Sequence, residues 1–430
     1  MTRPLTVALA GLGTVGGGVL KMLRDNADIV TARAGRPIAV TAVSARDRSK
    51  DRGSPMSGLH WYENPVALAA DPGVDVVVEL IGGSDGPALA LAEATLGAGK
   101  PLVTANKALL AVHGAALARL AEERGVALGF EAAVAGGIPV IKALREGLAG
   151  NRISAVAGIL NGTCNYILTQ MRERGREFAE VLADAQKLGY AETNPSFDID
   201  GIDAAHKLAI LAALAFGRPV AFKDVHIEGI RRISAVDIAF ASELGYRIKL
   251  LGIARQTEAG IETRVHPCMV PGSTPIATVD GVFNAVVAEG DFVGRVMLEG
   301  RGAGAGPTGS AVVADLIDIA RNRLTPVWGA AGSALSQAPS VPMSSHVGPY
   351  YLRLMVVDRP GVIADVTAIL RDMGVSLESM LQRGRSPGEA VPVVLVTHET
   401  KESAMRAALD RIGALPTVME EPTLIRIEAG

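Results

Sequence analysis

Short apolar runs and longer amphipathic segments alternate along the first third of the chain. The apolar runs predict buried strands at residues 5–10, 38–44, 74–81 and 101–104. A helix is predicted between the first two strands, over residues 15–24. Strands that alternate with helices are typical of a parallel sheet covered by helices. We therefore expect an α/β fold that begins with a Rossmann-type dinucleotide-binding domain over residues 1–130.

The middle of the chain combines an apolar helix with further strands. Residues 204–216 predict a helix that is apolar on every side, which is the pattern of a buried helix. Strands are predicted at residues 153–160 and 260–270 and, as a hairpin, within residues 285–299. We expect an α+β catalytic and dimerisation domain over residues 131–325, with a mixed sheet able to pair with a second subunit.

The last eighty residues have the order strand, helix, strand, strand, helix, strand. The predicted elements cover residues 350–357, 362–373, 376–382, 391–397, 401–412 and 423–428. This order gives a ferredoxin-like sandwich. Residues 325–347, just before it, are rich in Ser, Ala, Pro and Gly, which indicates a domain junction. A separate C-terminal domain is therefore expected over residues 348–430.

The composition excludes several classes of protein. Of the 430 residues 49% are hydrophobic, too many for a disordered chain, and the net charge of -3 leaves no basic surface for nucleic acid. No apolar run approaches the roughly 18 residues that span a membrane. Two cysteines cannot form a disulfide framework, so we expect a cytoplasmic protein, with Cys164 as a core residue rather than a nucleophile.

A G-x-G-x-x-G pattern lies between the first strand and the first helix. Its first glycine makes a tight turn, the second lets a pyrophosphate approach the backbone, and the third lets helix and strand pack closely. The free N–H groups of the helix start then face the phosphates. Ordinary glycine turns share the pattern, but its place between a strand and a helix favours a dinucleotide. The predicted contacts are Gly11, Leu12, Gly13, Thr14, Val15 and Gly16.

The end of the second strand bears on the choice between NADP and NAD. An acidic residue there binds the ribose 2′-hydroxyl of NAD, whereas an Arg suits a 2′-phosphate. Here the strand ends in Ala-Arg-Asp-Arg, so Arg46 favours NADP. Asp47 keeps NAD possible. Arg48 and Lys50 are either helpers of Arg46 or solvated loop charges.

The turn after the fourth strand carries a lysine in an unusual place. Thr104 ends the strand, and Lys107 begins the next helix, where the helix dipole disfavours a cation. A lysine placed against that preference is expected to face an anionic ligand. The carboxyl ends of the strands are also where open α/β sheets bind their ligands, so Thr104 and Lys107 are candidate cofactor contacts.

A glycine-rich stretch at residues 302–310 precedes a helix predicted over residues 311–321. Residues without side chains let a backbone approach a ligand closely. A flexible linker is the alternative, but the helix that follows at once, with Thr308 or Ser310 as its cap, disfavours it. The candidate contacts in this stretch are Gly304 and Gly306.

The strongest chemical signal is the charged segment at residues 185–207. Asp203 and Lys207 lie four residues apart, so they share one face of the predicted buried helix. Charges at the start of such a helix are costly unless they are paired or bind a ligand. A structural ion pair is the alternative, but perturbed ionisable groups concentrate at functional sites.

This segment resembles the hallmark sequence of homoserine dehydrogenases. The matching positions are Ala185, Gly189, Tyr190, Ala191, Asn194, Pro195, Asp198, Ile199, Gly201, Asp203 and Lys207. The Thr-x-Asn-Lys turn at Lys107 is also similar to that family. The sequence Asp-Arg-Pro-Gly-Val-Ile-Ala-Asp-Val at residues 358–366 resembles an ACT domain, a small module that senses amino acids.

The resemblance implies an NAD(P)H-dependent reduction of aspartate 4-semialdehyde to L-homoserine, in the biosynthesis of threonine, methionine and isoleucine. Lys207, with Lys107 nearby, would supply a proton and stabilise the oxyanion, while Asp203 holds Lys207. The implied substrate contacts are Gly189, Glu192, Asp198 and Asp203.

The resemblance also implies a monovalent cation, sodium, and an assembled enzyme. The cation would be held by backbone carbonyls of Glu131, Val134, Gly136 and Ile138. Residues 302–325 would return to the nucleotide domain near the nicotinamide. A homodimer or homotetramer is implied, with threonine as the effector.

Two other functions are compatible with the same residues. The chain could be another amino-acid-linked NAD(P) dehydrogenase that uses the same Asp-Lys pair on a different substrate. It could also be a non-catalytic amino-acid sensor, against which the intact pair of Asp203 and Lys207 argues. The C-terminal domain could serve dimerisation alone.

Overall fold

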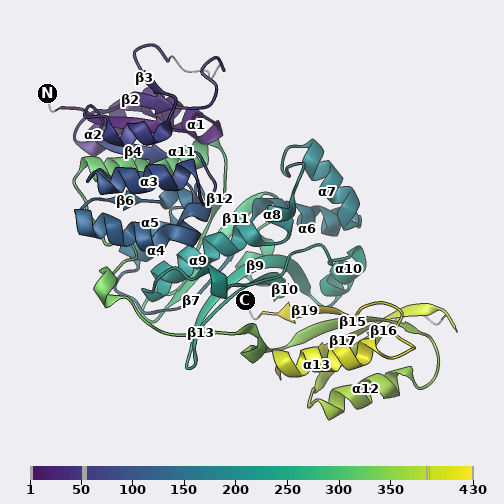
Figure 1. Cartoon of the computed structure of the whole chain (residues 1–430). Coiled ribbons are helices and arrows are strands. Elements are labelled where there is room, and N and C mark those ends of the chain that lie inside the picture. The colour runs from purple at the N-terminus through teal and green to yellow at the C-terminus, as the bar shows by residue number, and fades with distance from the viewer. Residues whose placement is uncertain (1–2, 51–55, 384–385, 387, 429–430) are drawn as a thin grey trace.

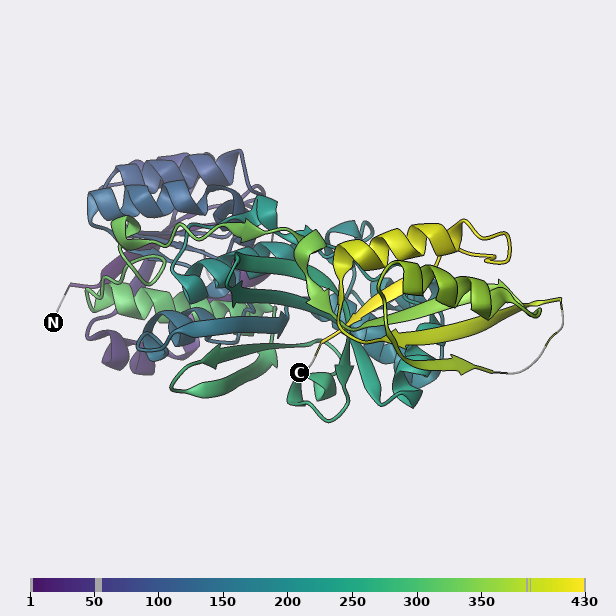
Figure 2. The same cartoon turned by 90° about the horizontal axis from the view of Figure 1, so that it is seen from below.

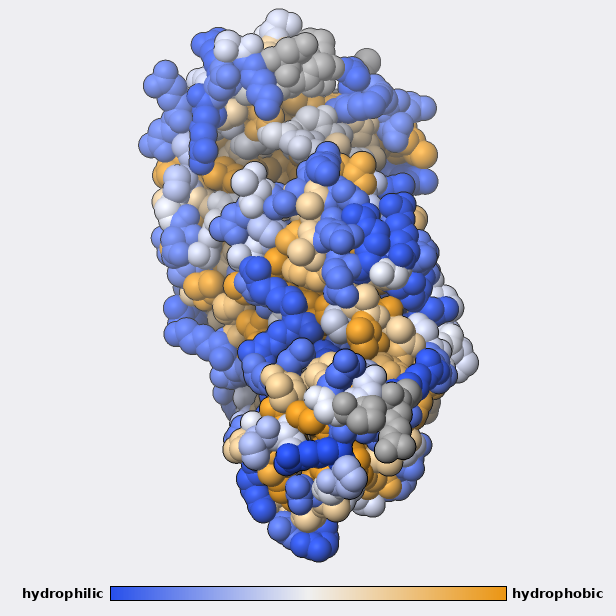
Figure 3. Space-filling view, turned by 90° about the vertical axis from the view of Figure 1, so that its right-hand side faces the viewer, coloured by the Kyte–Doolittle hydropathy of each residue, from blue (hydrophilic) through white to orange (hydrophobic). Residues whose placement is uncertain are grey.

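The computed structural model describes residues 3–50, 56–383, 386 and 388–428 of the chain. Three parts follow one another in Figure 1: the N-terminal unit, a central sheet with its helices, and a C-terminal module. On the face shown in Figure 3, hydrophilic side chains cover most of the surface, and apolar ones appear in small groups between them. Among the described residues, every helix is too short or too polar to cross a membrane.

The N-terminal unit is a parallel six-stranded sheet of the Rossmann type, as predicted. Its strands are β1 (Leu5–Ala10), β2 (Ile38–Ser44), β3 (His60–Tyr62), β4 (Val76–Glu79), β5 (Leu102–Thr104) and β6 (Leu128–Gly129). They follow the order β3-β2-β1-β4-β5-β6, the order of doubly wound dinucleotide-binding folds. The helices of this unit are α1 (Thr14–Asp25), α2 (Ala27–Ala34), α3 (Pro87–Gly97) and α4 (Lys107–Arg124).

Helix α11 (Ala305–Ala320) returns from the central part and packs against α1 (Figure 1). The two helices approach closely because Gly18 and Gly309 face each other; a Cβ atom on Gly18 would meet the Ala305 carbonyl oxygen at 2.1 Å. The predicted helix start at residue 311 is wrong, and so is the predicted cap. Gly304 is the N-cap, and no side chain caps the helix. Proline is tolerated at Pro307 because the first N–H groups of a helix have no intrahelical partner.

The central part is a mixed sheet that is covered on one face by helices. Its main strands are β7 (Ile153–Ile159), β9 (Tyr246–Thr257), β10 (Gly260–Pro271), β11 (Phe283–Gly290) and β12 (Gly294–Arg301). Its helices are α6 (Gly162–Arg174), α7 (Phe178–Lys187), α8 (Ser196–Ile199), α9 (Ile202–Phe216) and α10 (Ala235–Glu243). Helix α9 lies between the sheet and α4 of the N-terminal unit, and its residues 203–214 are all buried, as predicted.

The C-terminal module has the predicted ferredoxin-like order. It consists of β15 (Tyr350–Val357), α12 (Val362–Asp372), β16 (Leu377–Gln382), β17 (Ala390–Thr397), α13 (Glu402–Gly413) and β19 (Thr423–Ile427). Its two helices lie side by side on one face of its sheet (Figure 2).

The module and the central part share one sheet. Strand β19 pairs with β10 through Cys268–Arg426 and Met269–Ile427. The predicted junction is also ordered, because β13 (Ser340–Val341) adds to β10 as well. The module is therefore joined to the central part by backbone pairing, which the sequence pattern did not indicate.

Candidate active site

The glycine turn after β1 has the geometry of a dinucleotide site. A Cβ atom on Gly11 would meet the Leu80 carbonyl oxygen at 2.5 Å, and one on Gly16 would meet the Gly11 carbonyl oxygen at 2.2 Å. Nothing lies within 4 Å of the corresponding position on Gly13. Helix α1 begins without a side-chain cap, so its first N–H groups are open to an anion.

An open cleft extends from this turn toward the ends of β2 and β4. The exposed side chain of Arg46 lies at its border. Arg48 instead places its guanidinium over the Trp61 ring, 5.8 Å from the centroid. Asp47 accepts hydrogen bonds from the backbone N and side-chain Oγ of Ser49. Of the predicted cofactor residues at β1 and β2, Gly11, Leu12, Gly13 and Arg46 thus border one open space.

The turns after β4 and β5 are locked together by Glu79 and Asn106, which the sequence pattern did not single out, and by Thr104, a predicted cofactor contact. The buried carboxylate of Glu79 accepts hydrogen bonds from the Thr104 hydroxyl at 2.6 Å and from the backbone of the turn after β4. The Asn106 amide donates to the Gly83 carbonyl at 2.7 Å and caps α4 through its oxygen. These bonds fix the start of α4 and with it the position of Lys107.

The centre of the site is a carboxylate between two lysines. Asp203, 3% exposed, lies 2.8 Å from the Lys107 ammonium through one oxygen and 2.7 Å from the Lys207 ammonium through the other. Lys207 also donates to the Leu160 carbonyl at 2.7 Å. The anion that Lys107 meets is therefore a side chain of the same chain. Because α4 and α9 belong to different parts, the cluster lies where the nucleotide unit meets the central sheet.

A fourth side chain, Asn161, joins this cluster. Its amide nitrogen donates to Asp198 and to Asp203, each at 2.8 Å. Asp198 is half-buried, whereas Glu192 and Gly189 are exposed on the loop after α7. The structure thus brings Asp198 to the lysines and leaves Glu192 and Gly189 at the outer border. Asn161 was predicted only as part of a turn, and its one sequence signal is its place before a helix.

Burial and pairing shift the charged groups in different directions. Complete burial lowers the pKa of Lys207, although Asp203 opposes this effect. Burial also acts to lower the pKa of Lys107, but the charge of Asp203 outweighs it and the pKa is raised. Burial by itself would raise the pKa of Asp203, yet the two ammonium groups hold it well below its usual value. The cluster therefore keeps an ionised aspartate next to one lysine that gives up its proton more readily.

The loop predicted to hold a cation packs against α11 and residues 301–303. Ala135 has a φ of 55° and Gly136 a φ of 43°, so two successive residues are left-handed, which is strained for an alanine. The Glu131 carboxylate accepts hydrogen bonds from the backbone N of Ile141 and Lys142. Burial raises the pKa of Glu131 to about 7, with a contribution from Asp315. Oxygen ligands from a bent backbone are compatible with a hard cation.

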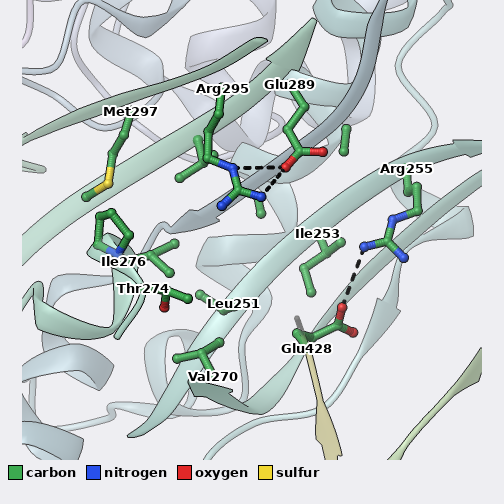
Figure 4. Close-up of a pocket in the computed structure, with 14 residues that line it drawn as sticks. Leu251, Ile253, Arg255, Val270, Thr274, Ile276, Glu289, Arg295, Met297 and Glu428 are labelled. Atoms are coloured by element: carbon green, nitrogen blue, oxygen red, sulfur yellow. Dashed lines mark hydrogen bonds and ion pairs between the residues drawn. The ribbon is translucent and has the colours of Figure 1, made fainter. Parts of the chain in front are cut away.

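An apolar hollow lies on the central sheet, and none of the predicted site residues line it (Figure 4). Its base is made by side chains of β9, β10 and β12, including Leu251, Ile253 and Met297. Two ion pairs border it, Arg295 with Glu289 at 2.7 Å and Arg255 with Glu428 at 3.8 Å.

Family models and known relatives cover nearly the whole chain. The NAD-binding domain of homoserine dehydrogenase matches residues 11–131, homoserine dehydrogenase matches residues 139–317, and the ACT domain matches residues 350–416. The homoserine dehydrogenases of Pseudomonas aeruginosa and Helicobacter pylori are 47% and 44% identical, covering 99% and 100% of both chains.

Solved structures give the same result. The homoserine dehydrogenase of Thiobacillus denitrificans is 48% identical with a TM-score of 0.94 and covers 99% of each chain. A hyperthermophilic archaeal homoserine dehydrogenase, in complex with NADPH, is 25% identical with a TM-score of 0.65, covering 75% of this chain and 100% of its own.

Proposed function

The chain belongs to the homoserine dehydrogenase family, and we propose that Lys107, Asp203 and Lys207 form the catalytic centre at which it reduces aspartate 4-semialdehyde to L-homoserine. The observation that carries this proposal is the buried Asp203 held between two ammonium groups where the nucleotide unit meets the central sheet. The bound nicotinamide supplies the hydride. What the chain itself must supply is a proton and a stabilising charge at the carbonyl oxygen.

Lys207 is the proton donor in this proposal. Two of the three N–H groups of its ammonium are fixed by the Leu160 carbonyl and by Asp203, so the third has a defined direction. Its lowered pKa makes the proton easier to transfer at neutral pH. Lys107, whose pKa is raised, remains charged and stabilises the oxyanion.

The two aspartates have separate tasks. Asp203 holds both lysines and keeps them protonated. Asp198 binds the ammonium group of the substrate, assisted by Glu192 from the outer loop and by the backbone at Gly189. Asp198 is suited to this task because it lies beside the lysines and is only half-buried.

The chain binds a nicotinamide cofactor, and we propose that NADP is preferred. Arg46 offers an exposed guanidinium at the border of the cleft, where a 2′-phosphate would lie, while Asp47 is engaged with Ser49.

We further propose that carbonyls of Glu131, Val134, Gly136 and Ile138 hold a sodium ion. Such an ion would order the loop that packs on residues 301–303, next to Gly304.

Two copies of the chain are proposed to pair through the open face of the central sheet. Apolar side chains there form the hollow of Figure 4, and Phe292, at the tip of the β11–β12 hairpin, is 90% exposed.

Threonine is the proposed effector of the ACT module. The start of α12 offers N–H groups to the carboxylate of threonine, and the carboxylate of Asp358 is available to its ammonium group. The Asp358 carboxylate also accepts a hydrogen bond from the backbone N of Ser386.

Both cysteines are free and buried, which supports a cytoplasmic location.

The decisive experiment measures oxidation of NADPH by the purified chain with aspartate 4-semialdehyde, and the reverse reaction with L-homoserine and NADP. Other amino-acid-derived aldehydes and threonine are assayed beside them. Turnover that is highest with the semialdehyde supports the assignment. Higher turnover with another aldehyde would favour a different dehydrogenase, and no turnover with any aldehyde would favour a sensor.

A further inference from the structure

Asn161 contacts both aspartates of the site, although nothing in the sequence pattern marked it for a role in the chemistry. It lies in the turn between β7 and α6 and is 4% exposed. One amide nitrogen donates to Asp198 Oδ1 and Asp203 Oδ2, both at 2.8 Å. Two carboxylates of different function therefore share one donor group.

The orientation of this amide is fixed. The Asn161 oxygen accepts a hydrogen bond from the backbone N of Cys164 at 2.8 Å, and this bond caps α6. A turned amide would break the cap and point its oxygen at two carboxylates. The NH₂ group can therefore only face Asp198 and Asp203. The preceding residue, Leu160, holds the Lys207 ammonium through its carbonyl. One short turn thus orients both aspartates and a lysine.

The shared donor also reduces the repulsion between the carboxylates. Burial raises the pKa of Asp198; the Asn161 bond lowers it, Asp203 raises it, and the ammonium groups of Lys207 and Lys107 lower it. The charged groups that act on Asp198 are Asp203 and Lys207 of α9 and Lys107 of α4. Cys164 of α6 contacts the backbone of Asp198, because its Sγ lies 3.3 Å from the Asp198 carbonyl oxygen.

We propose that Asn161 is a positioning residue of the reaction, which holds Asp198 toward the substrate ammonium and Asp203 against the two lysines. The inference rests on the proposed function of the cluster and deepens it. A purely structural role, capping α6, predicts something different. Ser and Asp cap helices about as well as Asn, so the two roles can be separated at this one position.

Asn161→Ser keeps a cap but is too short to reach the carboxylates, and Asn161→Asp keeps a cap but places a third carboxylate beside them. Asn151→Ser is the matched control, because the Asn151 amide bonds only to backbone, at Leu148 and Val293, outside the cluster. Thermal unfolding and the affinity for NADPH report on the fold, and kcat and KM for the semialdehyde report on the site.

We expect both Asn161 variants to bind NADPH and Asn161→Ser to unfold near the wild-type temperature, whereas the third buried carboxylate should lower the unfolding temperature of Asn161→Asp. In Asn161→Ser, kcat/KM should fall about 10–100-fold, with KM raised, since a hydrogen bond to a charged group is lost. Asn161→Asp should be less active still. In wild type the Asn161 hydrogen bond lowers the pKa of Asp198, so its loss in Asn161→Ser should raise that pKa. The acid limb of the kcat/KM profile should therefore move to higher pH.

A kcat/KM within twofold of wild type in Asn161→Ser would overturn the inference. So would an equal loss in Asn151→Ser, or a loss that follows reduced stability with an unmoved acid limb. Lys207→Ala in the same assay separates the two proposals. If wild type turns over and Lys207→Ala does not, the proposed function stands whatever Asn161→Ser does, and a wild type without turnover overturns both.

Discussion

Replacing Lys207 by alanine tests the proposed proton donor most directly. General acid catalysis by a positioned side chain contributes about 10²–10⁴-fold, so we expect kcat to fall by that factor. The fold should survive. Removing one partner of a buried ion pair costs about 3–5 kcal/mol when the other charge is left unpaired. Asp203, however, keeps Lys107 at 2.8 Å and Asn161 at 2.8 Å, so the loss in stability should lie at or below about 3 kcal/mol.

Lys249 provides a matched control for this substitution. It is 1% exposed in the same central sheet, and its ammonium lies 3.0 Å from Asp280, which also binds Arg172. Lys249→Ala therefore removes a buried lysine from an aspartate that keeps a second cation, away from the proposed catalytic cluster. We expect a comparable loss of thermal stability with kcat unchanged.

Steady-state kinetics with NADPH and the semialdehyde, together with thermal unfolding of all three proteins, give the answer. A Lys207→Ala variant within twofold of wild-type kcat would refute the assignment. Equal losses of kcat in the two variants would also refute it, since the effect would then follow from stability. NADPH should bind to both variants as to wild type.

Three further predictions concern the charges around the site and the effector. Asp203→Asn should move the basic limb of the kcat/KM profile to lower pH. Asp203 raises the pKa of both lysines, and each lysine must be protonated to act. An unmoved basic limb would contradict the pairing of Asp203 with the lysines. Arg46→Ala should raise KM for NADPH about 10–100-fold more than KM for NADH, and equal effects would show that Arg46 does not bind the 2′-phosphate. Asp358→Ala in the full chain should weaken inhibition by threonine without changing activity in its absence, as dose–response curves at fixed substrate would reveal; unchanged inhibition would place the effector elsewhere.

The sequence predicted most elements because their signals are local. Strands β1 and β2 have the predicted bounds, since each is a short apolar run that ends in a turn. The start of α11 was misjudged because its first turn contains glycine and proline. That turn packs closely on distant segments, because a Cβ atom on Gly18 would meet the Ala305 carbonyl oxygen and one on Gly137 would meet Pro307; no local pattern reveals such contacts.

The candidate site was predicted in part for the same reason. Lys107 was found by its unfavourable place at a helix start, and Asp203 by its spacing from Lys207, but their mutual contact depends on how two units pack. Asn161 and Glu79 were missed because each acts through a side chain that joins separate turns. An asparagine before a helix predicts that its side-chain oxygen caps the helix. It does not indicate which groups its amide nitrogen contacts.

The continuous sheet bears on how regulation can be tested. A chain ending near Ser344 would lose β19, which pairs with β10, and β15, whose Tyr351 belongs to the same apolar core as the central part. Buried Asp237 of α10 would lose Arg353 at 2.7 Å and the Tyr351 hydroxyl at 3.1 Å.

Glu228 would also lose Arg426, and Arg264 would lose Glu428. Truncation also opens these residues to solvent, so each lost pair should cost less than the roughly 3–5 kcal/mol of a charge left buried and unpaired. The losses, together with the apolar surface uncovered from the shared core, are still large against a total stability of about 5–15 kcal/mol for a typical domain. We therefore expect the truncated chain to unfold at a lower temperature and to lose activity even without threonine. A truncated chain that does not respond to threonine would then say nothing about where the effector binds. The Asp358→Ala substitution in the full chain is therefore the better test. A truncated chain with wild-type stability and activity would show instead that the module is separable and that the shared sheet is dispensable.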